Sequence, residues 1–313
     1  MGREDGQIDL KQLTYLHKVL ESGNITRAAE SLGIAQTALG FQIRNLEDEL
    51  GVTLIQRHSR GVEATEAGEL LARYADTIIS RIETAKQAVS MVGREKVTPV
   101  TLGVTPSVMR LVGDDIVIEL QKSIPEVSLR VVEELSFMLG QMMARGELTC
   151  ALHYGRDIPG DMERRALLEE DLYFITAPDV TPDDGPVPFQ EVAAQDLVMT
   201  TRRDAVFVAV DAIAKRMNLS LNVAYEVTSI RAMKNIAARG IAGTIMPYGA
   251  AEGELRKGEL KGRPIISPAI TRTLQFVYPR EHATLLESAA FQGFIDSIVE
   301  RMLAARGPVM RRL

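Results

Sequence analysis

The segment that most constrains the fold of this chain is residues 24–50, which has the pattern of two short helices joined by a tight turn. Gly33 lies at the turn, where a compact connection needs a residue that adopts positive φ. Ala28 and Ala29 are small enough for two helices to cross closely, as in a helix-turn-helix whose second helix enters the DNA major groove. A helical hairpin in a larger bundle would show the same periodicity. Small or apolar residues recur on one face of each helix: Ile25, Ala28, Ala29 and Leu32, then Leu39, Ile43, Leu46 and Leu50.

The next segment, residues 51–64, favours the helix-turn-helix over the bundle. It is typical of a short β-ribbon with a basic tip, formed by Arg57, His58 and Arg60. Thr65 follows and is expected to cap the next helix, because a threonine hydroxyl accepts a hydrogen bond from a free N–H of the first turn. Residues 1–65 are therefore predicted to form a winged helix-turn-helix domain.

Within these residues the chain resembles the LysR-type transcriptional regulators, in register over about the first 65 positions. Shorter matches, Ile34-Ala35-Gln36 and Ile270-Thr271-Arg272-Thr273-Leu274, resemble the nitrogen-assimilation-control branch of that family. The motifs that carry the resemblance are Leu13-Thr14-Tyr15-Leu16, Thr26-Arg27-Ala28-Ala29, Gln36-Thr37-Ala38-Leu39, Gln42-Ile43, Leu46-Glu47, Leu50-Gly51 and Arg60-Gly61-Val62.

The face of the second helix opposite its apolar stripe is expected to read DNA. We expect Gln36 to reach a base edge, Arg44 a base or phosphate, and Arg57 and Arg60 phosphates. The resembling family usually has Ser at position 40 and a polar residue at position 41. Glycine at position 40 would allow close approach of the backbone to DNA, and Phe41 would meet a thymine methyl or pack on a neighbouring helix. The full set expected to bind DNA is Thr26, Gln36, Thr37, Gly40, Phe41, Arg44, Arg57, Arg60 and Thr65.

The charge of the chain does not itself indicate a nucleic-acid partner. The net charge is −6, and residues 1–60 hold seven Lys or Arg against eight Asp or Glu. The electrostatic contribution to DNA binding must therefore come from the placement of charges. The single cysteine, Cys150, lies in an apolar run and is expected to be a core residue. With no transmembrane-length run and a polar N-terminus, we expect a soluble cytoplasmic protein without membrane contact.

Residues 66–93 have the pattern of one long helix with a near-heptad apolar seam. A helix packed on its own domain is the alternative, but the position of the seam between a small module and a larger body favours dimerisation, and in the resembling family this element pairs two subunits. Residues 66–96 are therefore assigned to a linker helix and hinge. The seam consists of Leu71, Tyr74, Ile78, Ile82, Ala85, Val89 and Val92.

From residue 97 onward, short apolar strands alternate with helices, which is typical of an α/β body with mostly parallel sheets. Residues 97–313 are long enough for two lobes, and two charged or proline-rich segments, near residues 159–165 and 263–268, are expected to be the crossovers. Lobe 1 is thus assigned to residues 97–162 and 268–304, and lobe 2 to residues 163–267. The resemblance implies the same architecture, two lobes like those of a periplasmic binding protein.

Hydroxyl side chains recur at the expected carboxyl ends of strands, where open α/β sheets bind ligands and helix N-termini favour anions. Each hydroxyl alone would be read as a helix cap, but their recurrence predicts a polar cleft for a small carboxylate or inorganic anion. Asp204-Ala205 departs from the family, which often has an amide or histidine followed by glycine there, and an acid would repel an anion. The expected effector-binding residues are Thr105, Ser107, Ser136, Thr201, Arg202, Thr228, Ser229 and Pro247.

Catalytic and metal-binding patterns are absent from the sequence, and no cofactor is expected. The favoured interpretation is a LysR-type regulator, not an enzyme, whose promoter binding responds to a small-molecule effector. The alternatives are a cytoplasmic solute-binding protein without a DNA role and an enzyme built on the α/β body. The expected partners are double-stranded promoter DNA, the effector, further copies of the chain in a homodimer or homotetramer, and RNA polymerase.

Overall fold

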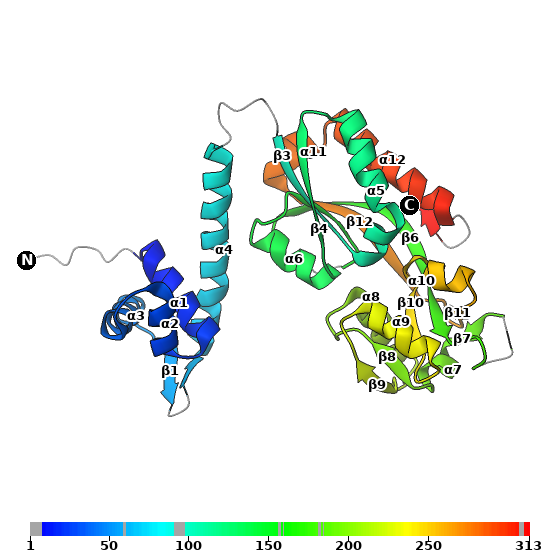
Figure 1. Ribbon diagram of the computed structural model, residues 1–313, viewed down its shortest axis with the longest axis horizontal. Helices are drawn as coiled ribbons and strands as arrows, with labels where there is room; N and C mark the ends of the chain where they lie inside the picture. The colour runs from blue at the N-terminus through cyan, green and yellow to red at the C-terminus, as the bar shows by residue number, and fades with distance from the viewer. Residues whose placement is uncertain are drawn as a thin grey trace, which may run out of the picture. The chain divides into compact units, whose positions relative to one another are not determined.

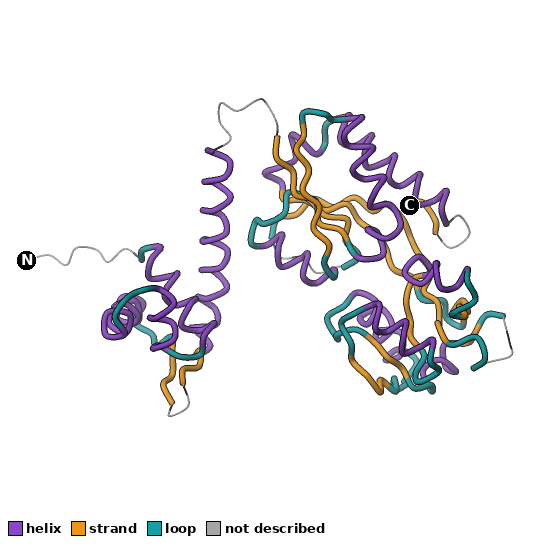
Figure 2. Tube along the Cα trace, in the orientation of Figure 1, coloured by secondary structure: helices purple, strands orange, loops and turns teal. Residues whose placement is uncertain are grey.

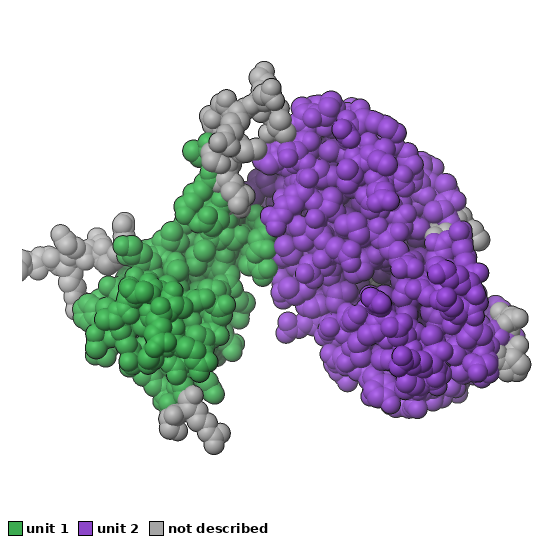
Figure 3. All heavy atoms as spheres, in the orientation of Figure 1, with its two compact units in different colours: residues 1–92, 145–147 green, residues 93–144, 148–313 purple. Residues whose placement is uncertain are grey.

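The computed structural model describes residues 8–58, 61–90, 98–155, 158, 160–180, 183, 185–306 and 310–313. The chain divides into two compact units, coloured separately in Figure 3: residues 1–92 with 145–147, and residues 93–144 with 148–313. In the part of the chain so described, no helix is both long and apolar enough to cross a membrane.

The first unit is a winged helix-turn-helix followed by a long helix, as predicted (Figure 1). Leu16, Ala28, Leu39, Ile43 and Leu46 are fully buried, so the apolar faces predicted for the two helices of the motif form its core together with α1. Gly33 ends the first helix of the motif at a φ of 67°, which explains why glycine is needed there. The elements are α1 (Leu10–Ser22), α2 (Ile25–Leu32), α3 (Gln36–Leu50), β1 (Ile55–His58), β2 (Gly61–Ala64) and α4 (Glu66–Ser90).

The first lobe of the second unit is a sheet covered by helices on both faces. The strands run in the order β4-β3-β5-β12-β6, and β13 also pairs with β6. Side chains of α5 and α12 pack on one face of the sheet and those of α6 on the other. The elements are β3 (Thr98–Val104), α5 (Pro106–Ser123), β4 (Val127–Glu133), α6 (Ser136–Ala144), β5 (Cys150–His153), β12 (Thr271–Pro279), η1 (Arg280–His282), α11 (Ala283–Leu286), α12 (Ala289–Arg306) and β13 (Met310–Arg312).

The second lobe is built around the far half of β6 (Met162–Thr176). That half pairs with β10 and β11, and the near half pairs with β12 of the first lobe, so β6 belongs to both lobes (Figure 2). Helices α7 and α8 pack on one face, and α9 and α10 on the other. The remaining elements are β7 (Val187–Pro188), α7 (Phe189–Ala193), β8 (Leu197–Met199), α8 (Ala205–Arg216), β9 (Val223–Glu226), α9 (Ile230–Ala238), β10 (Thr244–Pro247), α10 (Tyr248–Arg256) and β11 (Lys261–Ile266).

Three details of the expected body are wrong. The sheets are mixed, because β12 and β6 run antiparallel to each other and β12 runs antiparallel to β5. The first crossover lies inside β6, where pairing changes from β12 to β10 near Asp171 and Leu172, and not at residue 163. The second follows β11, so the run from Arg263 to Ile266 is a strand and not a connection.

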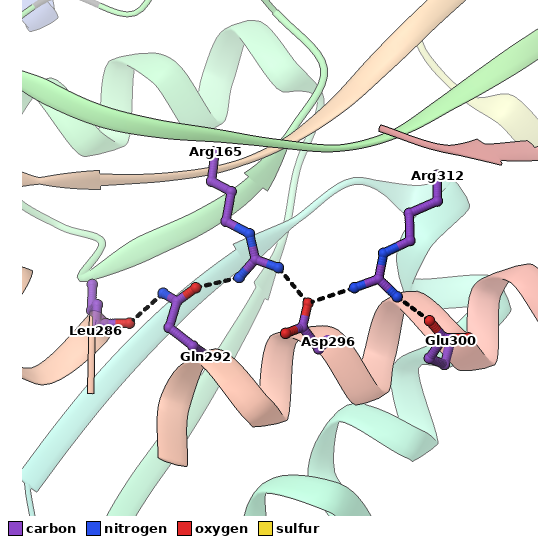
Figure 4. Close-up of polar contacts among 6 residues, drawn as sticks. All are labelled: Arg165, Leu286, Gln292, Asp296, Glu300 and Arg312. Carbon is purple, nitrogen blue, oxygen red and sulfur yellow. Dashed lines mark hydrogen bonds and ion pairs between the residues drawn. The ribbon is translucent and has the colours of Figure 1, made fainter. Parts of the chain in front are cut away.

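The charged run at the start of β6 remains a strand because neighbouring groups satisfy its charges (Figure 4). Arg165 donates to Gln292 and pairs with Asp296, both on α12. Arg312 of the terminal strand β13 reaches the same Asp296 at 3.1 Å and pairs with Glu300. Gln292 in turn donates to the carbonyl of Leu286 at 2.6 Å. The charged run near residues 159–165 was therefore predicted wrongly to be a crossover, because a high density of charge in the sequence is compatible with a strand whose charges are paired.

Candidate functional site

Helix α3 carries the exposed face expected to read DNA, and the helix before it, α2, has a well-defined N-terminal cap. Asn24 caps α2, and its Oδ1 accepts hydrogen bonds from the N–H groups of Thr26 and Arg27 at 2.9 and 3.1 Å. Four of the residues expected to read DNA are exposed on α3: Gln36, Thr37, Phe41 and Arg44. The amide, the hydroxyl, the aromatic ring and the guanidinium offer the groups with which side chains contact base edges and phosphates.

Phe41 is 59% exposed. This exposure excludes the alternative in which Phe41 packs against a neighbouring helix of its own chain. Gly40 and Leu50 lie differently from their expected positions. Gly40 is buried, because the Arg57 guanidinium of the wing lies over it, 3.7 Å from where a Cβ would stand. Leu50, placed on the buried stripe by periodicity, is exposed because it ends the helix beyond the core.

The wing is the β1–β2 ribbon, with Arg57 opposite Val62. Arg57 is exposed, whereas Arg60 lies outside the described residues. Thr65 caps α4 as expected, since its hydroxyl accepts from the Gly68 N–H at 3.0 Å. The same hydroxyl donates to the Thr53 carbonyl at 2.7 Å. The first bond caps α4, the second ties its start to the segment that leads into β1, and the hydroxyl is therefore engaged within the domain.

Helix α4 presents most of its expected seam to solvent in the single chain. Tyr74 and Val89 are 62% and 71% exposed, and Ile78 is also exposed. Leu71 is partly buried against the core of the helix-turn-helix, next to the fully buried Ala75. Ile82 is partly buried and Ala85 is exposed, while position 92 lies outside the described residues. An apolar stripe of this length left open on a helix is typical of an association surface.

A cavity of about 460 Å³ lies in the second unit between its two lobes. Four of the expected effector-binding residues line it: Thr105, Ser107, Ser136 and Pro247. The other four, Thr201, Arg202, Thr228 and Ser229, are not among its lining residues. The Arg202 guanidinium lies over the Phe207 ring at 5.4 Å, and the Ser229 hydroxyl caps α9 by accepting from the Ala232 N–H at 3.3 Å. The sequence therefore indicated the correct loops, but in the loops after β8 and β9 the residues selected are not the ones that line the cavity.

Thr200 is the hydroxyl that the loop after β8 directs into the cavity, in place of the expected Thr201. It is only 4% exposed, and its Oγ1 has no hydrogen-bond partner among the described residues. A buried hydroxyl without a partner costs free energy. A ligand that hydrogen-bonds to Thr200 would recover that free energy.

Arg272, which lines the cavity, belongs to a buried ion pair that sequence reasoning missed. The Arg272 guanidinium pairs with the Glu170 carboxylate at 2.7 Å, donates to the Ser107 hydroxyl at 2.8 Å and stacks on the Tyr154 ring at 3.6 Å. The Tyr154 hydroxyl donates to Glu170 at 3.1 Å, and Thr105 and Ser107 hydroxyls lie 3.2 Å apart. Burial opposes the charge of Arg272, but Glu170, Tyr154 and Asp204 together outweigh burial and raise the Arg272 pKa.

A second group of charges lines the cavity and joins the lobes. Lys234 of α9 donates to Glu254 of α10 at 2.5 Å, and Arg110 of α5 in the first lobe reaches the same carboxylate at 3.2 Å. Although partial burial raises it, the contacts with Lys234 and Arg110 leave the Glu254 pKa below its ordinary value. This bridge links the lobes across the cleft without a ligand.

His153 lies beneath the cavity wall and fixes the start of α6. Its Nε2 donates to the Ser136 carbonyl at 2.7 Å, because its Nδ1 accepts from the Gly155 N–H at 2.7 Å. Burial lowers the His153 pKa, so the neutral imidazole is the favoured form. Among the residues described, no group of three or more His, Cys, Asp or Glu side chains could hold a metal ion.

Arg272 and its partner Glu170 could have been found in the sequence from the period-of-two pattern of a strand. Arg272 lies two positions from the buried Ile270 and Leu274, and Glu170 lies two positions from the buried Leu168 and Leu172. Residues two apart on a strand point to the same face. A charge at a position that the pattern assigns to the core needs a buried partner. Such a reading identifies Arg272 and Glu170, though not their pairing with each other.

Two family models cover most of the chain. Residues 10–69 match the model described as "Bacterial regulatory helix-turn-helix protein, lysR family", and residues 93–303 match "LysR substrate binding domain". The chain belongs to the LysR family. It is a DNA-binding transcriptional regulator with an effector-binding domain, and the expected class and fold are confirmed.

Individual proteins agree with this assignment. The "Nitrogen assimilation regulatory protein nac" of Klebsiella aerogenes is 31% identical over 295 residues, covering 94% of this chain and 96% of that protein. The "Hydrogen peroxide-inducible genes activator" of Haemophilus influenzae is 28% identical over 282 residues, covering 87% and 90%. The crystal structure of CbnR, a LysR family transcriptional regulator, superposes with a TM-score of 0.64 at 18% identity, covering 94% and 99%. This last likeness concerns the fold alone.

Proposed function

We propose that this regulator reads its promoter with the exposed face of α3 and holds the DNA backbone with the wing. The observation that carries the proposal is the set of side chains on α3 that are exposed and carry no part of the domain core: Gln36, Thr37, Phe41 and Arg44. Arg57, with Arg60 beside it in the sequence, is proposed to contact phosphates, and Thr26 the DNA backbone. Gly40 and Thr65 are proposed to support the interface indirectly, through Arg57 and the α4 cap.

The test is a gel-shift titration of the full chain against the DNA upstream of its own gene and against random DNA. Replacing Gln36 by Ala should cost about 1–3 kcal/mol on the specific site and less on random DNA, as expected for a base contact. Arg57→Ala should weaken both and lower the slope of log K against log salt by about one unit. Glu49→Ala, exposed at the far end of α3, is the matched control. Equal losses on both DNAs for Gln36→Ala would exclude base reading.

We propose that the regulator acts as a homo-oligomer, a dimer or a tetramer, joined along α4. The open apolar stripe of Tyr74, Ile78 and Val89 supports this proposal. The double substitution Ile78→Asp and Ile82→Asp should give monomers in analytical ultracentrifugation, because carboxylates in an apolar seam lose solvation. Arg73→Asp, exposed on the same helix, is the control that should leave assembly intact. A wild-type chain that sediments as a monomer at micromolar concentration would refute it.

We propose that the inter-lobe cavity binds a small-molecule effector whose preference for one lobe arrangement shifts promoter binding. Its size suits a small ligand, and the partnerless Thr200 hydroxyl supports a bound group. Thr105→Val should abolish thermal stabilisation by any effector while DNA binding without ligand persists. Cys150 is fully buried, which raises its thiol pKa, so we propose that sensing does not use the chemistry of this thiol. We further propose that the protein acts in the cytoplasm, without catalysis of its own, and contacts RNA polymerase at the promoter.

A further inference from the structure

The charges around the inter-lobe cavity form two unbalanced groups. The first group contains Asp204, the ion pair of Arg272 with Glu170, and the Thr200 hydroxyl. Asp204 is the N-cap of α8, is 7% exposed and lines the cavity. Its Oδ1 accepts from the Val206 N–H at 2.9 Å. Throughout the described chain, Asp204 has no ion-pair partner within 4 Å.

Arg272 is a buried cation close enough to Asp204 for the two charges to interact, and its guanidinium is already bound to other groups. Its guanidinium pairs with Glu170 through two nitrogens, at 2.8 and 2.7 Å, and donates to Ser107. The first group therefore contains one buried cation, Arg272, and two buried carboxylates, Glu170 and Asp204. This group holds one negative charge in excess, and a buried carboxylate without a cation of its own is costly.

Thr200 provides an independent sign that a ligand belongs beside Asp204. Its Oγ1 is buried without a partner and lines the same cavity, in the loop that leads into α8. A hydroxyl oxygen accepts hydrogen bonds as well as donating one. A ligand group with several donors would satisfy both Thr200 and Asp204, and an ammonium group has three donors.

The second group has the opposite sign. Lys234 and Arg110 share the single carboxylate of Glu254, which leaves one positive charge in excess. The two remaining charged lining residues, Glu133 and Arg231, are exposed to solvent, which screens them. Apolar side chains, among them Met109, Leu135, Ile230 and Met246, line the rest of the cavity.

We propose that the effector is a zwitterion of the amino-acid class, whose ammonium group binds Asp204 and Thr200 and whose acidic group faces Lys234 and Arg110. The proposal rests on the cavity being the effector site. It replaces the expectation of a simple anion, because the carboxylate of Asp204 would repel one. The apolar lining then receives the side chain of the ligand.

The test begins with the twenty amino acids as probes of the full-length chain, by thermal shift and then calorimetry. Each amino acid that binds is compared with its deaminated acid and its decarboxylated amine, as phenylalanine is with 3-phenylpropanoate and 2-phenylethylamine. We expect the amino acid to bind at least about tenfold more tightly than the deaminated acid, the difference expected from one charged hydrogen bond. A deaminated acid that binds equally well, or a panel in which no amino acid binds, overturns the proposal.

Asp204→Asn tests the assignment directly, because asparagine is an equally good N-cap and preserves α8. It should weaken binding of the amino acid about tenfold or more and leave the deaminated acid unaffected or tighter. Asp211→Asn is the matched control, since Asp211 lies on the same helix and pairs with Lys215 at 2.6 Å. Thr200→Val should also weaken the amino acid, and Thr201→Val should not.

The variants also separate this proposal from the effector site on which it rests. If an amino acid binds and Thr105→Val abolishes its binding while Asp204→Asn does not weaken it, the cavity is the effector site but the ammonium assignment is wrong. If an amino acid binds and neither Thr105→Val nor Asp204→Asn changes its affinity, the ligand lies elsewhere and both proposals fail.

Discussion

The proposed DNA-reading face of α3 and the charged residues at the inter-lobe cavity differ in burial and in sequence separation. On α3, Gln36, Thr37, Phe41 and Arg44 lie within nine consecutive positions and are exposed, so they are free of the domain core. At the cavity, the lining residues Ser107, Asp204 and Arg272 and the Glu170 partner of Arg272 come from distant segments, and three of the four are buried charges. The proposed DNA-reading face can thus vary with little effect on folding, whereas the side chains of the proposed effector site also stabilise the fold.

The largest expected effect tests the stabilising part of that comparison. Arg272→Met should lower the free energy of unfolding by about 3–5 kcal/mol, because it leaves the Glu170 carboxylate buried without its cation. Urea denaturation measures the change. The double variant with Glu170→Met should recover much of it, since no uncompensated charge remains. Arg311→Ala provides the control, because this half-exposed arginine pairs with Asp171 at 2.8 Å and Glu169 at 3.0 Å on the surface, and its loss should cost about 1 kcal/mol or less.

The next effect tests the freedom of the α3 face. Phe41→Ala should weaken binding to the specific promoter site by about 1–3 kcal/mol, the range of one lost base contact. The unfolding free energy should change by no more than about 0.5 kcal/mol, because the ring contacts solvent and not the core. If the ring meets a thymine methyl, uracil in place of that thymine should cost wild type as much as the variant loses. A loss of stability without loss of affinity would assign Phe41 to packing.

A smaller effect concerns the glycine behind that face. Gly40→Ala should raise the unfolding free energy by about 0.5–1 kcal/mol, because alanine restricts the unfolded chain and favours helix. The added methyl has room, since the nearest atom, Arg57 Nη2, lies at an ordinary contact distance of 3.7 Å. Affinity for DNA should remain near that of wild type. A strong loss of affinity at unchanged stability would restore the idea that the backbone at Gly40 approaches DNA closely.

The smallest effect is the pH dependence contributed by His153. Burial lowers its pKa from the ordinary value of 6.5, so the unfolded chain takes up a proton at a higher pH than the folded chain. The stabilising contribution is therefore present above pH 6.5 and is lost as the pH falls toward the folded pKa. Between about pH 7.5 and about pH 5.5, wild type should lose more stability than His153→Gln. Parallel pH profiles for the two proteins would show that His153 does not titrate in this range.

The two regions also differ in how well the sequence predicts them. The sequence predicted the helix-turn-helix, the wing and the Thr65 cap. The signals used were apolar periodicity, the position of Gly33 and the position of one capping residue, and each of them extends over only a few residues. Gly40 was misplaced because Arg57, which covers it, comes from the wing, seventeen positions along the chain. The exposure of Phe41 could be determined only from the folded structure, because periodicity alone allowed the ring either to face solvent or to pack on a neighbouring helix.

In the effector domain, the sequence by itself determined the alternation of strands and helices and the loops at which Thr105, Ser107, Ser136 and Pro247 meet. Only the tertiary structure decided that β6 belongs to both lobes, that Thr200 and not Thr201 lines the cavity, and that Arg272 pairs with Glu170. The physical reason is that periodicity records which side of an element is apolar, and does so locally. The balance of buried charge depends on which distant segments the fold brings within a few ångströms of one another, and no local pattern contains that distance.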